Sequence, residues 1–256
     1  MVNFRKKSTD QRCYEIQFEG EGSLDGGSSF RESLTKIVRE MESGVVPLLL
    51  KSPNNRNEHG PNRDCFIFDC RHKSPTHKTM FKYLGAFLAF AFMSKSPMPF
   101  NLAPWFWKQL LEQEVTLADL EGIDAYSAQV LRDLEQFAQS LSAEDFALGV
   151  QQTFITVLSS GDEVPLCEGG AERRVTRENL AEFLALVLET RRQEAREQVA
   201  AVREGFLTAI NHKTEILDFT SWSSLEVRCT GEKEVSAERL LSITIHPNIY
   251  ENYEAV

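Results

Sequence analysis

The chain has 256 residues, a formal net charge of −10 at pH 7 and a sequence pI near 5.1. This length suits one large domain or two small ones, and 42% hydrophobic residues with 17 phenylalanines exclude an intrinsically disordered chain. The acidic balance argues against nucleic acid as a partner, because phosphate binding needs clustered Lys and Arg. We therefore expect a folded protein that does not bind nucleic acid.

The apolar segments predict neither secretion nor membrane insertion. The first ten residues are polar and basic, unlike a signal peptide. The longest apolar run, residues 83–93, is too short to span a bilayer and predicts a buried helix. The five cysteines are odd in number and scattered: Cys13, Cys65, Cys70, Cys167 and Cys229. Free thiols in a reducing compartment fit this pattern better than disulfides, so we expect a cytoplasmic protein with no membrane contact.

The first part of the chain mixes a strand, helices and short apolar runs. Residues 1–17 predict an entry strand or a tail, because Tyr14, Ile16 and Phe18 alternate with polar residues. Short apolar runs predict strands at residues 45–50 and 65–69, with a polar loop at 51–64 between them. Apolar side chains at helical spacing predict helices over residues 30–42, 76–94, 104–113 and 125–141. Thr116 and Asp119 have the spacing of a helix N-terminal capping pair.

The periodicity changes after residue 151. Residues 152–158 alternate as a strand, and EVPL with ERRV predicts a hairpin whose turn contains Gly169 and Gly170. A helix follows Thr176, and a second amphipathic helix runs from Ala195 to Phe206 after a polar stretch at 189–194. The alternating charges of residues 189–204, including Arg191 and Arg192, predict a solvated helix face with surface ion pairs.

Several segments, in the same order, resemble one family. The chain contains FEGEGSLDGGSSFRE from Phe18, PLLLKSPNNRNEHGPNRDCFIF, MFKYLG from Met80, SPMPFNLAPWFWKQLLEQEVTLADLEGID, RRVTRENLAEFLALV and REQVAAVREGF. Together they are similar to HECT-type ubiquitin-protein ligase domains, most of all to the large HERC-type ligases, over residues 18–245. The resemblance implies an α+β, mostly helical fold, the N-terminal lobe of a HECT domain. It places a large subdomain at 1–119, a smaller inserted subdomain at 120–192, and an incomplete return segment of the large subdomain at 193–256.

The resemblance also implies the chemistry. HECT ligases accept ubiquitin on a cysteine from a conjugating enzyme and pass it to a substrate lysine. That cysteine lies in a separate C-terminal lobe, which we expect to follow Val256, so no residue of this chain is assigned a catalytic role. Cys229 matches an internal cysteine-glycine segment of the family instead. Whether the chain itself counts as an enzyme is therefore left open, and no cofactor is expected.

What remains is docking of the ubiquitin-charged conjugating enzyme in the inserted subdomain. By resemblance, the docking groove consists of Leu131, Leu134, Phe137, Val150, Phe183 and Leu186. Such a groove needs apolar side chains that are partly exposed until the partner covers them. The expected partners are a ubiquitin-conjugating enzyme, ubiquitin and protein substrates. One alternative is a non-catalytic scaffold or decoy that binds ubiquitin-pathway proteins, and another is a fragment that does not fold alone.

Two further patterns have structural explanations. Cys65, Cys70, His72 and His77, with His59 nearby, offer zinc-binding side chains, but without the paired spacing of common zinc sites, so no metal is expected. Trp105 and Trp107 follow Pro104 at the start of a predicted helix. A proline at this position favours a helix, and we expect both tryptophans to pack in the core.

Overall fold

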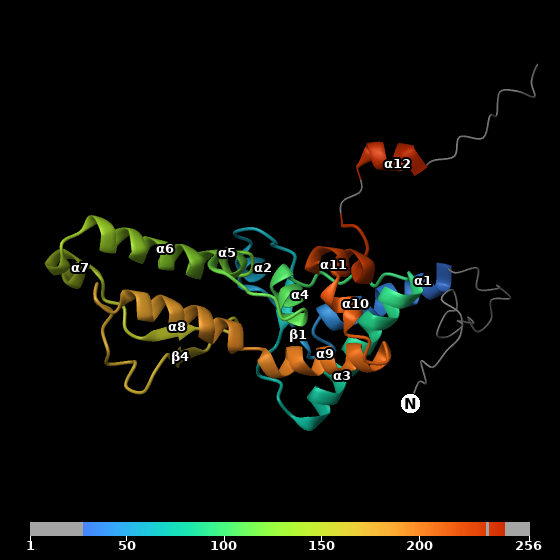
Figure 1. Cartoon of the computed structure of the whole chain (residues 1–256), viewed down its shortest axis with the longest axis horizontal. Coiled ribbons are helices and arrows are strands. Elements are labelled where there is room, and N and C mark those ends of the chain that lie inside the picture. Colours follow the sequence, from blue (N-terminus) through green and yellow to red (C-terminus); the bar gives the residue numbers. More distant parts are fainter. Residues whose placement is uncertain (1–27, 234–235, 244–256) are drawn as a thin grey trace, which may run out of the picture.

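The computed structural model describes residues 28–233 and 236–243, so the strand predicted for residues 1–17 lies outside the described residues. Its helices are α1 (Ser28–Glu42), α2 (Pro53–Asn57), α3 (Pro75–Ser94), α4 (Pro104–Leu110), α5 (Leu117–Glu121), α6 (Ala125–Ser140), α7 (Ala143–Gly149), α8 (Leu180–Gln193), α9 (Arg196–Ala209), α10 (Glu215–Asp218), α11 (Trp222–Thr230) and α12 (Ala237–Ile243). The strands are β1 (Leu49–Lys51), β2 (Phe66–Phe68), β3 (Ile155–Val157) and β4 (Glu163–Pro165). The predicted α+β, mostly helical class is confirmed. The elements form an elongated molecule with a separate buried core in each half (Figure 1).

The first core is built around the crossing of α3 and α9. Both helices bury apolar side chains there, including Leu84, Leu88 and Phe206. The backbones approach so closely that a Cβ on Gly85 would overlap the Val202 carbonyl, and one on Gly205 would overlap that of Lys82. Only glycine fits at such a contact. Helices α1, α4 and α11 pack around this crossing. Both tryptophans of α4 are buried as predicted, Trp107 in this core and Trp105 in the second.

A two-stranded antiparallel sheet joins the first core to the rest of the chain. β1 pairs with β2 in the register Leu49↔Phe68. The strand predicted at 45–50 begins only at Leu49, because the residues around Pro47 form turns and Val45 is 74% exposed. The loop predicted at 51–64 contains α2, whose first turn is capped by the Ser52 hydroxyl. This segment is therefore partly helical rather than only loop.

The second core lies between α6 and α8 and includes Phe154 and the partly buried Leu166, which flank the β3–β4 hairpin. We refer to the elements from α5 to α8, residues 117–193, as the α5–α8 unit. The predicted hairpin is wrong in its partners: β4 pairs with β3 through a turn at Gly161, whose φ is +94°. Residues 169–173 close a turn on themselves, since Arg173 N donates to Gly169 O, and Arg174 forms an isolated bridge with Thr153 rather than a strand pair with β4. Thr116 and Asp119 form the expected cap at α5.

The remaining helices follow α9. α10 and α11 lie beside the first core, whereas α12 projects away from it (Figure 1). Phe219, just after α10, is 91% exposed. Within residues 28–233 and 236–243, no helix combines the length and the apolarity needed to cross a membrane.

Candidate functional site

The structure buries most of the predicted groove. Leu131 and Leu134 on α6 are 5% and 6% exposed, Val150 after α7 is 7% exposed, and Phe183 on α8 is 2% exposed. All four belong to the second core, where the Phe183 ring meets the edge of Phe154 at 5.5 Å between centroids. The expectation that these four side chains are partly exposed is wrong. These four side chains are buried because α6 and α8 pack against each other, so they lie beneath the surface of this region and are not part of it.

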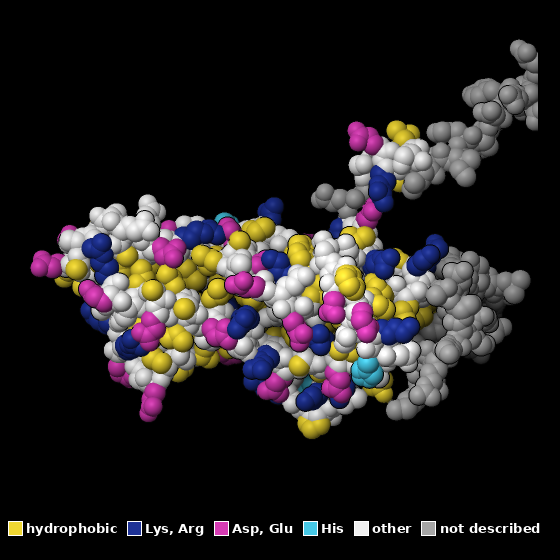
Figure 2. Space-filling model, viewed as in Figure 1, with side chains coloured by type: hydrophobic (Ala, Val, Ile, Leu, Met, Phe, Trp, Pro, Cys, Tyr) yellow, Lys and Arg dark blue, Asp and Glu magenta, His cyan; other side chains and the backbone are white. Residues whose placement is uncertain are grey.

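Phe137 and Leu186 are the predicted residues that reach the surface. Phe137 is 44% exposed, and Leu186 is half-buried against the second core. Residues spaced by three drift around a helix of 3.6 residues per turn by about 60° per step. The series that starts at Leu131 therefore leaves the core by the time it reaches Phe137. Figure 2 shows hydrophobic side chains gathered in the stretch between α6 and α8, on the face that it presents.

An exposed leucine that the sequence analysis missed lies near Phe137 along the chain. Leu148, on α7, is 77% exposed. Helix α7 was not predicted, although Ser142 with Asp145 three residues later is a capping signal, and the Ser142 hydroxyl accepts from Asp145 N. The end of α6 and all of α7 lie at the tip of the molecule farthest from the first core (Figure 1). This tip therefore presents two exposed apolar side chains, Phe137 and Leu148.

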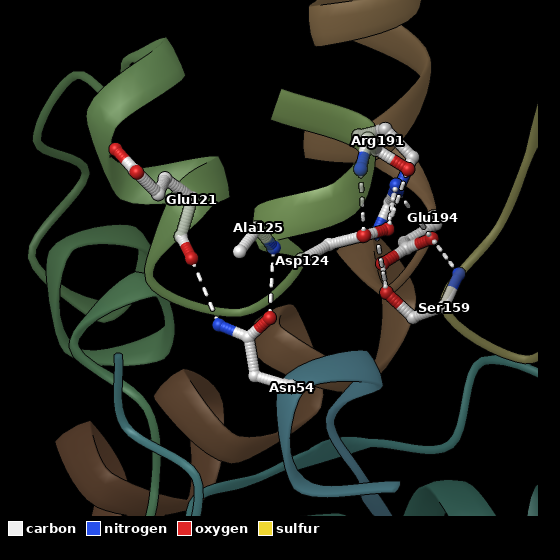
Figure 3. Close-up of polar contacts among 8 residues, drawn as sticks. Asn54, Glu121, Asp124, Ala125, Ser159, Arg191 and Glu194 are labelled. Carbon is white, nitrogen blue, oxygen red and sulfur yellow. Dashed lines mark hydrogen bonds and ion pairs between the residues drawn. The ribbon is translucent and has the colours of Figure 1, made fainter. Parts of the chain in front are cut away.

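A buried polar network fixes the base of the α5–α8 unit (Figure 3). Arg191, which is fully buried, donates to Asp124 Oδ2 at 2.8 Å and to Ser159 Oγ at 2.9 Å. Its Nε lies 3.4 Å from Glu194 Oε2, and Ser159 donates its hydroxyl to the same carboxylate at 2.6 Å. The network thus joins the start of α6, the β3–β4 turn and the end of α8. The predicted solvated face is wrong for Arg191, but right for Arg192, whose half-exposed side chain pairs with Glu189 at 2.5 Å.

Asn54 links this base to the first half of the molecule. It is 2% exposed and lies on α2. Its side-chain amide donates to Glu121 O at 2.8 Å, and its side-chain oxygen accepts from Ala125 N at 2.7 Å (Figure 3). A buried amide with its hydrogen bonds satisfied is costly to move. The α5–α6 turn is therefore held against α2 by side-chain as well as backbone contacts.

The buried thiols do not suit nucleophilic chemistry. Burial raises the pKa of Cys65 to about 11 and also raises the pKa values of Cys70 and Cys229. Such thiols stay protonated at neutral pH, whereas a nucleophilic cysteine must ionise. Cys229 also packs its sulfur 3.5 Å from Leu88 O in the first core. Among the residues that the structure describes, no group of His, Cys, Asp and Glu side chains is arranged to hold a metal ion.

Comparison with known proteins identifies the fold. The profile of the family described as "HECT-domain (ubiquitin-transferase)" matches residues 34–256, which is most of the chain. The chain belongs to the HECT-domain family. It is 32% identical over 241 residues to "E3 ubiquitin-protein ligase HERC2" of Homo sapiens, covering 93% of this chain and 5% of that protein. The predicted likeness to HECT domains, with a HERC-type ligase among the relatives, is confirmed.

Other HECT relatives match the same length of chain. "E3 ubiquitin-protein ligase HUWE1" of Mus musculus is 30% identical over 236 residues, which are 90% of this chain and 5% of that protein. "E3 ubiquitin-protein ligase RSP5" of Chaetomium thermophilum is 27% identical over 243 residues, which are 91% of this chain and 27% of that protein. The chain therefore spans only a small part of each of these relatives.

Proposed function

We propose that this HECT-family chain acts as the docking lobe of a ubiquitin-protein ligase in the cytoplasm. In this proposal the α5–α8 unit binds a ubiquitin-conjugating enzyme that carries ubiquitin as a thioester. Ubiquitin then passes to a cysteine outside this chain and from there to a lysine of a protein substrate. Family membership and the ligase names of the relatives support this role. The buried, protonated thiols of Cys65, Cys70 and Cys229 support a non-catalytic part for these three cysteines.

The exposed apolar tip of the α5–α8 unit carries the proposal. Phe137 and Leu148 are accessible to a partner, and their burial on binding would release water from apolar surface. Leu186, half-buried on α8, is the other residue of the predicted groove that keeps accessible surface. The buried residues of the predicted groove keep a role beneath this surface, because they hold α6 and α8 in place: Leu131, Leu134, Val150 and Phe183.

A docking surface gains affinity when it is formed before the partner arrives. The Arg191 network and Asn54 supply this rigidity at the base of the unit, where α6 starts and α8 ends. At the other end, Arg177 in the segment before α8 donates to Leu141 O, next to the end of α6, at 3.2 Å. The apolar tip is therefore presented on a unit that is tied at both ends.

Titration of the chain with a conjugating enzyme charged with ubiquitin through a stable linkage tests the proposal. Phe137→Ala should weaken binding by about 2 kcal/mol, roughly thirty-fold, if the ring is an anchor at the interface. Phe219→Ala is the control, because it removes a phenylalanine that is even more exposed but lies beside the first core. Equal affinities of the two variants and the wild type would remove the tip from the site. Absence of binding by the wild type to every conjugating enzyme tested would refute the proposed function itself.

A further inference from the structure

Lysine is missing from a long continuous segment that includes the whole α5–α8 unit. The chain has 11 lysines and 17 arginines, yet residues 109–212 contain eight arginines and no lysine. At the chain's overall frequency, a segment of this length would carry about four lysines. The segment is therefore not poor in cations, but every cation in it is an arginine.

Hydrogen-bond geometry does not explain this choice at every position. Arg173 and Arg191 use several nitrogens at once, which an ammonium group cannot imitate. Arg174, by contrast, uses one nitrogen toward Gln151 Oε1 at 2.8 Å, and Arg177 uses one toward Leu141 O. Arg192 likewise pairs with Glu189 through one nitrogen. A lysine could make each of these three contacts, so folding alone does not require arginine there.

The chemical difference between the two residues is nucleophilicity. A lysine amine that meets a ubiquitin thioester attacks its carbonyl carbon and forms an isopeptide bond. The carbon–sulfur bond breaks, the conjugating enzyme's sulfur leaves as a thiolate, and the amine loses a proton to solvent. An arginine guanidinium keeps its proton and its delocalised charge at any physiological pH, so it supplies ion pairs without becoming an acceptor.

We propose that the α5–α8 unit is an acceptor-free docking surface. The unit has 14 acidic residues and six basic ones, all of them arginines, so its own side chains offer no amine. A ubiquitin-charged conjugating enzyme bound there therefore cannot transfer ubiquitin onto the surface that holds it. The proposal rests on the function proposed above, because it requires the thioester to arrive at this unit. It assigns any stray modification of this chain to the lysines outside the segment.

Those lysines belong to the other half of the molecule. In the described residues outside the segment, the exposed lysines lie on or beside elements of the first half and the C-terminal helices: Lys36, Lys51, Lys73, Lys78, Lys95, Lys213 and Lys233. Lys82 and Lys108 are partly buried and paired with Glu204 and Asp119. Most acceptors on this chain thus lie away from the α5–α8 unit. The Lys108 amine is the exception among these lysines: it touches the unit at Asp119 on α5, where it is held in an ion pair at 2.6 Å.

Placing single lysines on the unit tests this idea with the full chain. Arg174→Lys, Arg177→Lys and Gln136→Lys each add an amine at an exposed position. Each variant is incubated with the thioester-charged conjugating enzyme, and modified lysines are mapped by mass spectrometry. We expect ubiquitin on at least one introduced lysine, at about tenfold the rate seen for Arg39→Lys on α1, because docking makes the transfer effectively intramolecular.

Two controls separate the possible outcomes. Gln136→Arg adds the same charge without an amine and should leave both binding and modification as in the wild type. If the charged enzyme binds all variants like the wild type, yet no introduced lysine is modified faster than that of Arg39→Lys, the acceptor-free surface is refuted while docking survives. If the wild type does not bind the charged enzyme at all, the proposed function and this inference fail together.

Discussion

Replacing Arg191 with methionine should destabilise the protein severely. Its side chain is fully buried, and the carboxylates that it neutralises, on Asp124 and Glu194, are only 10% and 5% exposed. Methionine fills similar space but leaves both carboxylates buried without a cation. Removing one partner of a buried ion pair costs about 3–5 kcal/mol, so Arg191→Met should lower the free energy of unfolding by about 4 kcal/mol. Urea denaturation with linear extrapolation measures this change.

The neighbouring arginine provides the control. Arg192 lies on the same helix, but its side chain is 44% exposed and pairs with Glu189 at the surface. Arg192→Met should therefore cost under about 1 kcal/mol, as surface pairs do. Combining Arg191→Met with Asp124→Asn and Glu194→Gln removes the uncompensated charges and should recover part of the loss. If Arg191→Met and Arg192→Met cost the same, the buried network does not stabilise the base of the α5–α8 unit.

Three further predictions follow from the packing and the charges. Gly205→Ala should lower the free energy of unfolding by about 3 kcal/mol in the same assay, because the added Cβ would overlap the Lys82 carbonyl. A near-neutral result would contradict the close α3–α9 crossing. Phe183→Ala should cost about 3–5 kcal/mol of stability by opening a cavity in the second core, and a stable variant that loses only binding would contradict its burial. Burial alone would raise the pKa of Asp119, but hydrogen bonds from Lys108 and the Thr116 backbone hold it below the usual value. The stability that wild type gains over Asp119→Asn should therefore be present above about pH 4 and decline as pH falls toward the lowered pKa. Urea midpoints from about pH 2 to 6 measure this, and a gain that is the same at both ends of this range would contradict it.

Local signals in the sequence predicted the long helices well. The apolar spacing of residues 30–42 and the helix after Thr176 correspond to α1 and α8, because each helix buries one continuous stripe. The capping pair of Thr116 and Asp119 depends only on neighbours in the chain, and it is present at α5. The family could also be predicted, since its motifs occur along the whole length of the match.

Burial was harder to predict, because it depends on the helix that packs opposite. Arg191 carries the charge of a surface residue, yet the N-terminus of α6 and the hairpin turn enclose it. Phe183 was expected to be partly exposed, yet its ring packs against Phe154 of the preceding segment. Leu148 was missed because α7 is only seven residues long and has too few apolar positions to show a period.

Hydrogen–deuterium exchange of the chain with and without a ubiquitin-charged conjugating enzyme tests the central claim most directly. Docking at the tip of the α5–α8 unit should slow exchange in the end of α6 and in α7, and leave α10 and α11 unchanged. Protection confined to the helices around the first core, with α6 and α7 exchanging as in the free chain, would contradict it.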